Sequence, residues 1–204
     1  MPTRNVVKIY VPDSYYHIYN RGWNLTEIFL DEEDYSYFER ILERHLSLKP
    51  RQDSRGREYA HFFPIIQLNA YCLMGNHFHM LVYQQNEHAI ADLMKSILVA
   101  YTFYFNKKYK RRGALFESTY KAVLIREDIQ LMHITRYIHL NHNSYQFWQH
   151  SSYQDYLSDE PREYINPRPI LELFASRKQY EEFVADYEEL QRERDTIKRE
   201  LSAE

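Results

Sequence analysis

Two histidines separated by a single residue, His77 and His79, stand in the apolar stretch 70–82. The apolar run is typical of a β-strand, and side chains two apart on a strand point to the same face. His77 and His79 can therefore share one metal ion, while Phe78 and Met80 turn to the opposite face and pack there. A strand with two ordinary surface histidines has the same pattern, so the pair alone does not define a site.

A phenol and an amide stand four residues apart at Tyr137 and Asn141, in the segment 128–143. Apolar residues recur in this segment at helical spacing, which places both polar groups on one side of a predicted helix. Each has a plainer alternative. Tyr137 is one of 20 tyrosines, most of which must pack in the core. Asn141 is of a type that often binds local backbone at a helix C-terminus.

Together these groups fit phosphodiester transesterification. The reference pKa of tyrosine is about 10, so attack by Tyr137 needs a nearby cation that favours its phenolate. A divalent ion held by His77 and His79 would provide that cation. The same ion would withdraw charge from a non-bridging phosphate oxygen and stabilise the charge that develops in the transition state.

Four blocks in chain order resemble a known family. They are Tyr16-His17-Ile18-Tyr19-Asn20-Arg21-Gly22, the stretch 70–82, the stretch 113–122 and Arg136-Tyr137-Ile138-His139-Leu140-Asn141. In these blocks the chain resembles the HUH-type single-strand DNA transposases, in particular the REP-associated tyrosine transposases of the IS200-like family. A weaker likeness continues through residues 150–156.

The resemblance implies a domain in which the histidine strand and the tyrosine helix meet around Mg²⁺ or Mn²⁺. It matches His77 and His79 to the metal-binding histidines, Tyr137 to the single nucleophile and Asn141 to the third ligand. In such enzymes the tyrosine attacks single-stranded DNA and leaves a 5′-phosphotyrosine link and a free 3′-hydroxyl. The implied partner is single-stranded DNA with hairpins, such as REP-like repeats, and the implied assembly is a monomer or a homodimer.

Two positions depart from the family pattern. Gly75 stands where the family usually has proline, and Asn141-His142 stands where it has an Asn-Pro pair. Gly75 can still form a turn before the histidine strand. Without a proline after Asn141, we expect the tyrosine helix to run on or to be capped differently.

Positive charge gathers before the third block, although the net charge is −3. Residues 181–204 hold nine acidic and four basic side chains, a net of −5, so residues 1–180 carry −3 + 5 = +2. The densest group of basic residues is the segment 107–112. Such a cluster can bind along a phosphate backbone, although a solvated loop is the alternative for each cation. The candidate DNA-binding residues are Asn20, Arg21, Lys107, Lys108, Lys110, Arg111, Arg112, Lys121 and Arg136.

The order of predicted elements indicates the fold class. The predicted strands cover 15–20, 65–71, 77–83 and 121–125, and the predicted helices cover 32–48, 88–105 and 128–143. This order is the split β-α-β arrangement with an added helix. We therefore expect an α+β, ferredoxin-like antiparallel sheet with helices on one face, an added catalytic helix and a C-terminal helical extension.

We expect residues 1–160 to form the catalytic domain and residues 161–204 a helical extension that is not an independent domain. The charged stretch 188–204 predicts a frayed, solvent-exposed helix, with a short coiled-coil seam as the alternative.

Composition agrees with a soluble intracellular enzyme. The chain is 44% hydrophobic and 16% aromatic, enough to bury one core. Its single cysteine, Cys72, allows no intrachain disulfide and fits a reducing cytoplasm. No apolar run approaches the ~20 residues that span a membrane, and the N-terminus lacks a secretory pattern. We expect a cytoplasmic protein without a membrane partner.

The sequence therefore predicts a metal-dependent tyrosine DNA transesterase, a transposase or nickase. One alternative is a domesticated, non-catalytic DNA-hairpin-binding protein, against which the intact His-Phe-His and Tyr-x-x-x-Asn patterns argue. Another is an HUH nuclease of the replication or relaxase type, against which the single candidate tyrosine and the short chain argue.

Overall fold

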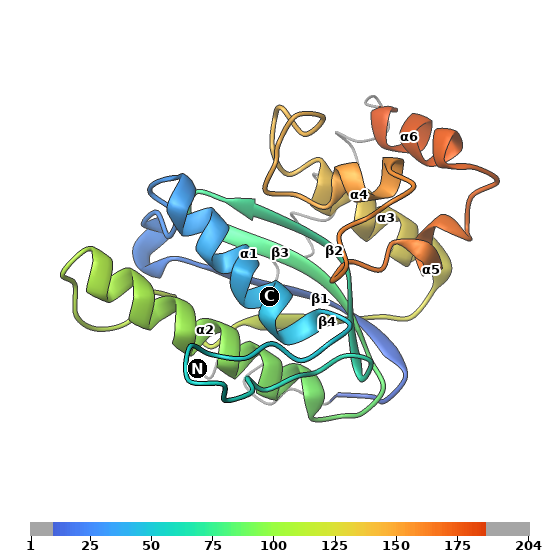
Figure 1. The fold of residues 1–204 in the computed structure, drawn as a ribbon. Helices are drawn as coiled ribbons and strands as arrows, with labels where there is room; N and C mark the ends of the chain where they lie inside the picture. Colours follow the sequence, from blue (N-terminus) through green and yellow to red (C-terminus); the bar gives the residue numbers. More distant parts are fainter. Residues whose placement is uncertain (1–9, 187–204) are drawn as a thin grey trace, which may run out of the picture.

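Four antiparallel strands form one sheet in the order β2-β3-β1-β4, in a computed structural model that describes residues 10–186. The strands are β1 (Ser14–Arg21), β2 (Ile66–Met74), β3 (His77–Gln84) and β4 (Lys121–Ile125). β1 pairs with both β3 and β4, so the first strand of the chain lies inside the sheet (Figure 1). This is the ferredoxin-like order, and the predicted fold class is confirmed.

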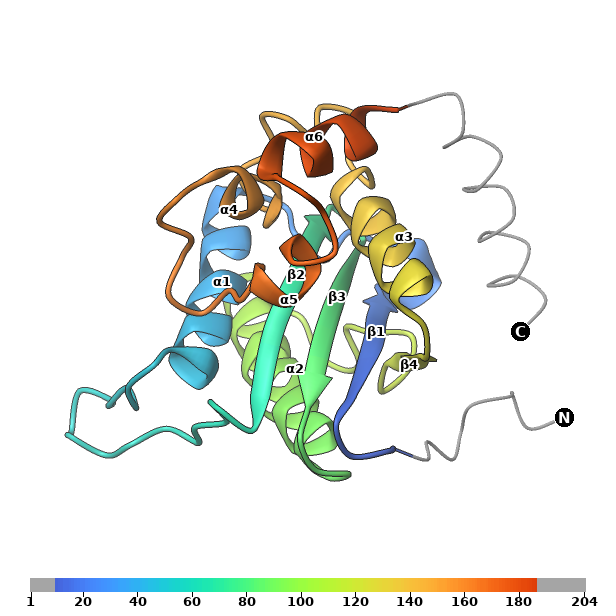
Figure 2. The ribbon, with the colours of Figure 1, turned by 90° about the vertical axis from the view of Figure 1, so that its right-hand side faces the viewer.

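Two helices cover one face of the sheet, α1 (Glu32–Leu46) and α2 (Ala89–Lys108) (Figure 2). α1 begins where the Asp31 side chain accepts a hydrogen bond from the Asp34 amide, at 3.1 Å. Its apolar side packs Phe38 against Phe78 of β3 and Tyr101 of α2. This larger core fixes the orientation of the strands.

The helices that follow β4 lie on the opposite face of the sheet (Figure 2). They are α3 (Asp128–His139), α4 (Tyr153–Leu157), α5 (Arg168–Leu171) and α6 (Arg177–Ala185). A second core joins them to β2 and β3 and contains Cys72, Leu81, Ile138, Tyr156 and Tyr180. The added tyrosine helix therefore has a hydrophobic base of its own, which holds it over the sheet.

The pleat of β1 and β3 separates core residues from polar ones. Ile18 and Phe78 face the α1–α2 layer and belong to the larger core. The intervening residues face the α3 layer, because successive side chains alternate between faces. The register pairs Tyr19 with His79 and Arg21 with His77, so the two histidines lie beside β1 on the α3 side.

The tyrosine helix is shorter than the predicted segment 128–143, and this expectation was wrong at its C-terminal end. α3 ends at His139, and the amide of Asn141 donates to the Ile138 carbonyl at 3.3 Å. The chain then turns, with the Ser144 amide donating to the His142 ring and that ring stacked on Trp148, 4.0 Å between centroids. The turn ends the helix without the family's proline.

A short 3-10 turn, η1 (Trp23–Leu25), follows β1. The predicted structure of residues 188–204 lies outside the described residues. Within residues 10–186, none of the helices combines the length and the apolar character needed to cross a membrane.

Candidate active site

His77 stands at the start of β3 with both ring nitrogens close to amide oxygens. Its Nδ1 lies 2.6 Å from Asn76 Oδ1 and its Nε2 lies 3.0 Å from Asn141 Oδ1. Burial lowers the pKa of His77, which keeps the ring neutral at pH 7. A neutral imidazole donates from one nitrogen only. When Nδ1–H donates to Asn76, Nε2 presents a lone pair on the side of Asn141.

His79 lies one pleat further along β3 and is held by a histidine of β1. Its Nδ1 and His17 Nε2 are 2.9 Å apart, and the two rings are stacked. Burial lowers the pKa of His79 well below its ordinary value and the pKa of His17 to about 3. Both rings are therefore neutral at pH 7, and a single proton lies between them.

Tyr137 closes the cluster from the α3 side. Its half-buried ring meets the His79 ring edge-on at 5.3 Å and the His17 ring at 6.1 Å. Leu131, Ile134 and Ile138 anchor its helix in the second core. Tyr137 lies in the last turn of α3, where the helix dipole disfavours negative charge. Ionisation of its phenol would therefore need a cation close by.

Asn141 reaches this cluster from beyond the helix. The sequence placed it on the tyrosine helix, whereas the structure places it after the C-cap residue Leu140. Its side chain nevertheless points to His77 and does not bind local backbone, as the Oδ1 contact shows. The turn after α3 brings Asn141 to His77, and the four-residue helical spacing is not what positions it.

The donor atoms present fit a small divalent cation. Two ligands at right angles around Mg²⁺, each about 2.1 Å from it, lie about 3 Å apart, and His77 Nε2 and Asn141 Oδ1 are 3.0 Å apart. Two imidazoles and one amide oxygen leave further positions for water or phosphate oxygens. Among residues 10–186, no group of three or more His, Cys, Asp or Glu side chains is arranged to hold a metal ion. A cation at His77 and His79 would therefore have the Asn141 amide oxygen as its third protein ligand.

Three of the nine candidate DNA-binding residues are engaged by other groups of the protein, which argues against their direct contact with DNA. Asn20 is 4% exposed, and its Nδ2 donates to the carbonyls of Ser118 and Thr119. Arg136 is 1% exposed, with its guanidinium 4.0 Å from the centre of the Phe183 ring. Both side chains lie where a DNA phosphate cannot reach them.

Lys108 is the third of these residues. Its Nζ lies 2.7 to 3.0 Å from carboxylate oxygens of Asp31, Glu33 and Asp34. Asp34 is completely buried, so its negative charge requires this partner. The Lys108 ammonium is therefore engaged by the carboxylates at the start of α1.

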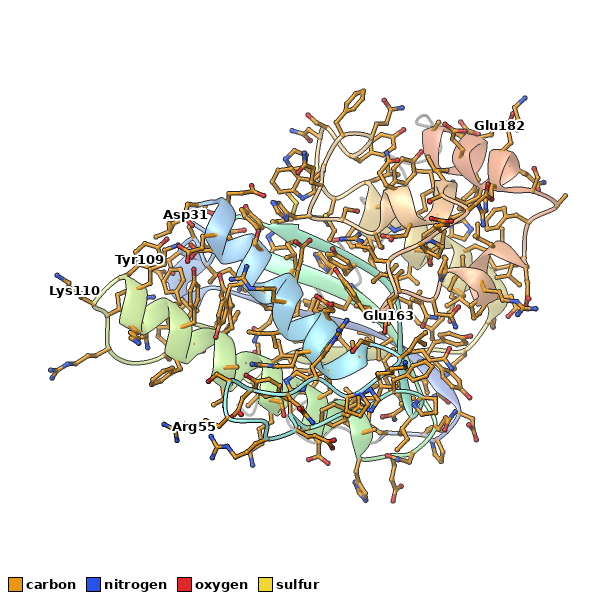
Figure 3. The ribbon with its side chains drawn as sticks, in the orientation of Figure 1. Asp31, Arg55, Tyr109, Lys110, Glu163 and Glu182 are labelled. Carbon is orange, nitrogen blue, oxygen red and sulfur yellow. The ribbon has the colours of Figure 1, made fainter. Side chains whose placement is uncertain are left out.

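Four candidate cations remain exposed in the last turn of α2 and in the loop after it, which Figure 3 places at the tip of the α1–α2 layer by its label Lys110. These exposed cations are Lys107, Lys110, Arg111 and Arg112. Two others stand on the sheet: Arg21 pairs with Glu117, and Lys121 Nζ lies 5.6 Å from the Tyr19 ring. α2 ends, β1 ends and β4 begins at the end of the sheet where His77 lies.

Sequence reasoning missed His17 and Asn76 as members of the site. Both lie inside the motif blocks, yet neither received a role. For His17 a signal existed, because it shares the pleat face of Tyr19 in a strand expected beside the histidine strand. The cross-strand register that brings His17 to His79 was not accessible from spacing along the chain.

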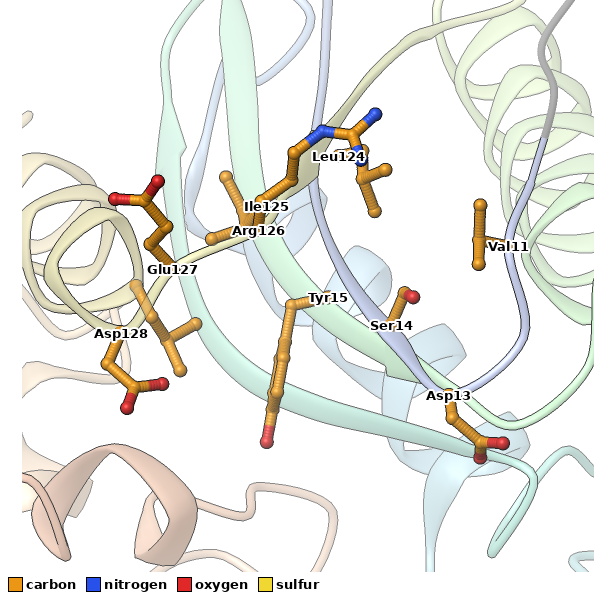
Figure 4. Close-up of a pocket in the computed structure, with 10 residues that line it drawn as sticks. Val11, Asp13, Ser14, Tyr15, Leu124, Ile125, Arg126, Glu127 and Asp128 are labelled. Carbon is orange, nitrogen blue, oxygen red and sulfur yellow. The ribbon is translucent and has the colours of Figure 1, made fainter.

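A separate pocket lies at the other end of β1 and β4, next to the start of α3 (Figure 4). Its volume is about 380 Å³, and its lining includes Asp13, Arg126, Glu127 and Asp128. Three carboxylates against one guanidinium make this pocket unsuited to a phosphate backbone. We assign it no role in DNA chemistry.

The fold and the site define a class of protein: a ferredoxin-like α+β domain in which paired strand histidines face a helix tyrosine. The family described as Transposase IS200 like matches residues 57–141, which include the histidine pair, Tyr137 and Asn141. The likeness to IS200-like transposases that the motifs indicate is thus confirmed. β1, with His17, lies outside the matched residues.

One solved structure has a similar fold. The chain is similar to a REP-associated tyrosine transposase bound to a REP hairpin, with a TM-score of 0.56 and 11% identity, over 80% of this chain and 92% of that chain. A putative transposase from Deinococcus radiodurans gives a TM-score of 0.39 and 17% identity, over 70% of this chain and 98% of that chain. No curated protein matches the chain. The family match and the fold support a transposase.

Proposed function

We propose that this protein is a transposase that cleaves and rejoins single-stranded, hairpin-bearing DNA through a covalent link to Tyr137. One observation carries the proposal. His77 and His79 each have Nδ1 beside a neighbouring polar atom, His77 Nε2 lies 3.0 Å from Asn141 Oδ1, and the Tyr137 ring meets the His79 ring edge-on.

In the proposed reaction the Tyr137 oxygen attacks the phosphorus of the scissile phosphodiester. The bond from tyrosine oxygen to phosphorus forms as the bond from phosphorus to the 3′-oxygen breaks. The phenol loses its proton, the leaving 3′-oxygen gains one, and the 5′-phosphate stays on Tyr137. Attack by a 3′-hydroxyl reverses the step, so rejoining needs no external energy source.

The proposed cation is Mg²⁺ or Mn²⁺, held by His77, His79 and Asn141. When bound, it supplies positive charge that polarises the phosphate and favours the phenolate. The protein itself orients the groups: β3 fixes the histidine rings, and the second core fixes the backbone of Tyr137.

The proposed DNA-binding set, without the three engaged residues, is Arg21, Lys107, Lys110, Arg111, Arg112 and Lys121. These cations lie on elements that meet at the end of the sheet where His77 stands, so one strand of DNA would pass from the loop after α2 to Tyr137. A hairpin beside that strand is the proposed substrate, supported by the fold that the chain shares with the REP hairpin-bound transposase.

The test is the formation of a covalent adduct. Purified protein, Mn²⁺ and a pool of single-stranded hairpin oligonucleotides are incubated and resolved on a denaturing gel. Tyr137→Phe should abolish the adduct and leave hairpin binding within about twofold, because only the hydroxyl is lost. Tyr145→Phe, at a half-buried tyrosine in the turn after α3, should retain the adduct. An undiminished adduct in Tyr137→Phe would move the nucleophile elsewhere.

The metal is tested with the double variant His77→Ala, His79→Ala. It should lose both the adduct and its dependence on Mn²⁺, while chelation should do the same to the unaltered protein. Metal-stimulated cleavage by the double variant would remove the proposed site. Hairpin binding without an adduct in the unaltered protein would favour the domesticated, non-catalytic binder.

A further inference from the structure

His17 of β1 contacts a proposed metal ligand, and its strand lies outside residues 57–141, which the transposase family matches. Its Nε2 lies 2.9 Å from His79 Nδ1, and the ring centroids are 5.1 Å apart with an angle of 17° between planes. His17 is 2% exposed, and the Tyr137 ring meets it edge-on. It is thus fixed between a ligand and the nucleophile.

The proton between the two rings has two arrangements. When it is on His17 Nε2, His79 Nδ1 accepts it, and the neutral His79 ring carries its own proton on Nε2, which cannot then bind a cation. When it is on His79 Nδ1, His17 Nε2 accepts it, and His79 Nε2 has a lone pair. Only the second arrangement leaves His79 ready to bind metal.

We propose that His17 is a positioning residue that accepts the Nδ1–H of His79 and thereby presents His79 Nε2 to the catalytic cation. The inference rests on the proposed function, because it needs His79 to be a metal ligand. His17 then holds its own proton on Nδ1. It touches neither DNA nor metal and acts through His79 alone.

The neighbouring ligand supports this assignment. His77 has its Nδ1 on the amide oxygen of Asn76, at 2.6 Å, and an amide oxygen can only accept. Both candidate ligands therefore have a partner at the same ring atom, one from the turn before β3 and one from β1. With Nδ1 protonated in both rings, the Nε2 atom of each would carry the lone pair that a cation needs.

The first measurement is the tautomer of His79 in the metal-free protein, read from long-range ¹H–¹⁵N correlations at pH 7.5 and assigned with His79→Ala. We expect the Nδ1–H form in the unaltered protein and loss of this fixed form in His17→Leu. A resident Nε2–H form in the unaltered protein would overturn the proposal without any reference to activity.

The second measurement is the Kd for Mn²⁺ by calorimetry on the full chain. His17→Leu should raise the Kd about 10- to 100-fold, the range typical of lost partners of metal ligands. His17→Gln should restore most of the affinity, since its amide oxygen can occupy the place of Nε2 as an acceptor. This rescue separates a lost hydrogen bond from simple loss of packing.

His45→Leu is the matched control. His45 is 3% exposed, and its Nδ1 hydrogen-bonds the Ala60 carbonyl at 2.6 Å, in the α1–α2 layer. His45→Leu should lose stability and keep the Kd for Mn²⁺. An unchanged Kd in folded His17→Leu would overturn the role of His17 alone, whereas absence of Mn²⁺ binding by the unaltered protein would overturn the metal site and this role together.

Discussion

The described histidines differ in role because the neighbours of each ring determine which of its nitrogens is already hydrogen-bonded. His139 is two residues after Tyr137, yet its ring turns into the second core, where it hydrogen-bonds Tyr180 and Ser152 at 2.6 and 2.8 Å. His77 faces two amide oxygens, and His79 faces another imidazole. A histidine is a possible metal ligand by its residue type. The hydrogen-bond partner at Nδ1 determines whether Nε2 carries a lone pair that can bind a cation.

At Asn141 the nature of the oxygen can be tested. Asn141→Ala removes one proposed ligand and leaves His77 Nε2 without its neighbour, so we expect the Kd for Mn²⁺ to rise more than about tenfold. Asn141→Asp should restore binding or tighten it, because a carboxylate is a stronger ligand for hard cations than an amide. Calorimetry measures both variants. Unchanged affinity in Asn141→Ala would show that Asn141 lies outside the coordination sphere.

The sequence predicted contacts between residues close together in the chain. It did not predict contacts between residues that only folding brings together. His77 and His79 share a face because a strand alternates, which spacing alone predicts. Asn141 meets His77 through a turn whose hydrogen bonds involve His142 and Trp148, and no helical spacing describes it. His17 meets His79 through the register of β1 on β3. That register depends on packing of both strands against two separate cores.

At the scale of elements, ion pairs join the end of α2 to the start of α1. Lys108 at the end of α2 meets Asp31 and Asp34 at the start of α1, and the hydroxyls of Tyr104 and Tyr109 also donate to Asp34. The basic residues of the segment 107–112 cannot be told apart by role from the sequence. Only folding distinguishes the member that neutralises a buried carboxylate from those that remain on the surface.

Lys107 and Lys108 provide a matched test of this distinction. Lys108→Met should lower the free energy of unfolding by about 1–3 kcal/mol, because Asp34 keeps a buried charge with fewer partners. Lys107→Met should leave unfolding unchanged and weaken DNA binding, with a salt dependence reduced by about one ion. Urea unfolding and fluorescence anisotropy measure the two effects. Equal loss of DNA affinity without loss of stability in Lys108→Met would return it to the DNA-binding set.

At the scale of the whole molecule, the two layers on opposite faces of the sheet are tied together around the outer edge of β2. The strand pairs with the segment before α4, where the Leu73 amide donates to the His150 carbonyl at 2.9 Å. The His150 ring reaches across to α1, with Nε2 2.9 Å from Glu32 and Nδ1 3.3 Å from Glu39. Trp148 in the same segment stacks on His142. The turn that carries Asn141 is thereby linked to the opposite layer.

This tie should respond to pH. Burial alone would lower the pKa of His150, but hydrogen bonds and charge from Glu39 and Glu32 outweigh it and raise the pKa above 6.5. Protonated His150 therefore stabilises the fold fully below pH 6.5, and this contribution is lost as pH rises through the folded-state pKa. Arg162 also faces Glu39, at 3.6 Å, and keeps its charge throughout.

His17 and His139 act in the opposite sense, because burial lowers the pKa of each to about 3. Their contribution is lost as pH falls below 6.5, so the unaltered protein alone does not isolate His150. The difference in unfolding free energy between it and His150→Gln does. We expect this difference, on the order of 1 kcal/mol at pH 6, to shrink toward pH 8.5, since glutamine does not titrate. The His150 ring also stacks on Tyr35, 4.3 Å between centroids. A difference that stays constant in urea titrations across that range would mean that His150 ties the layers by this packing and not by charge.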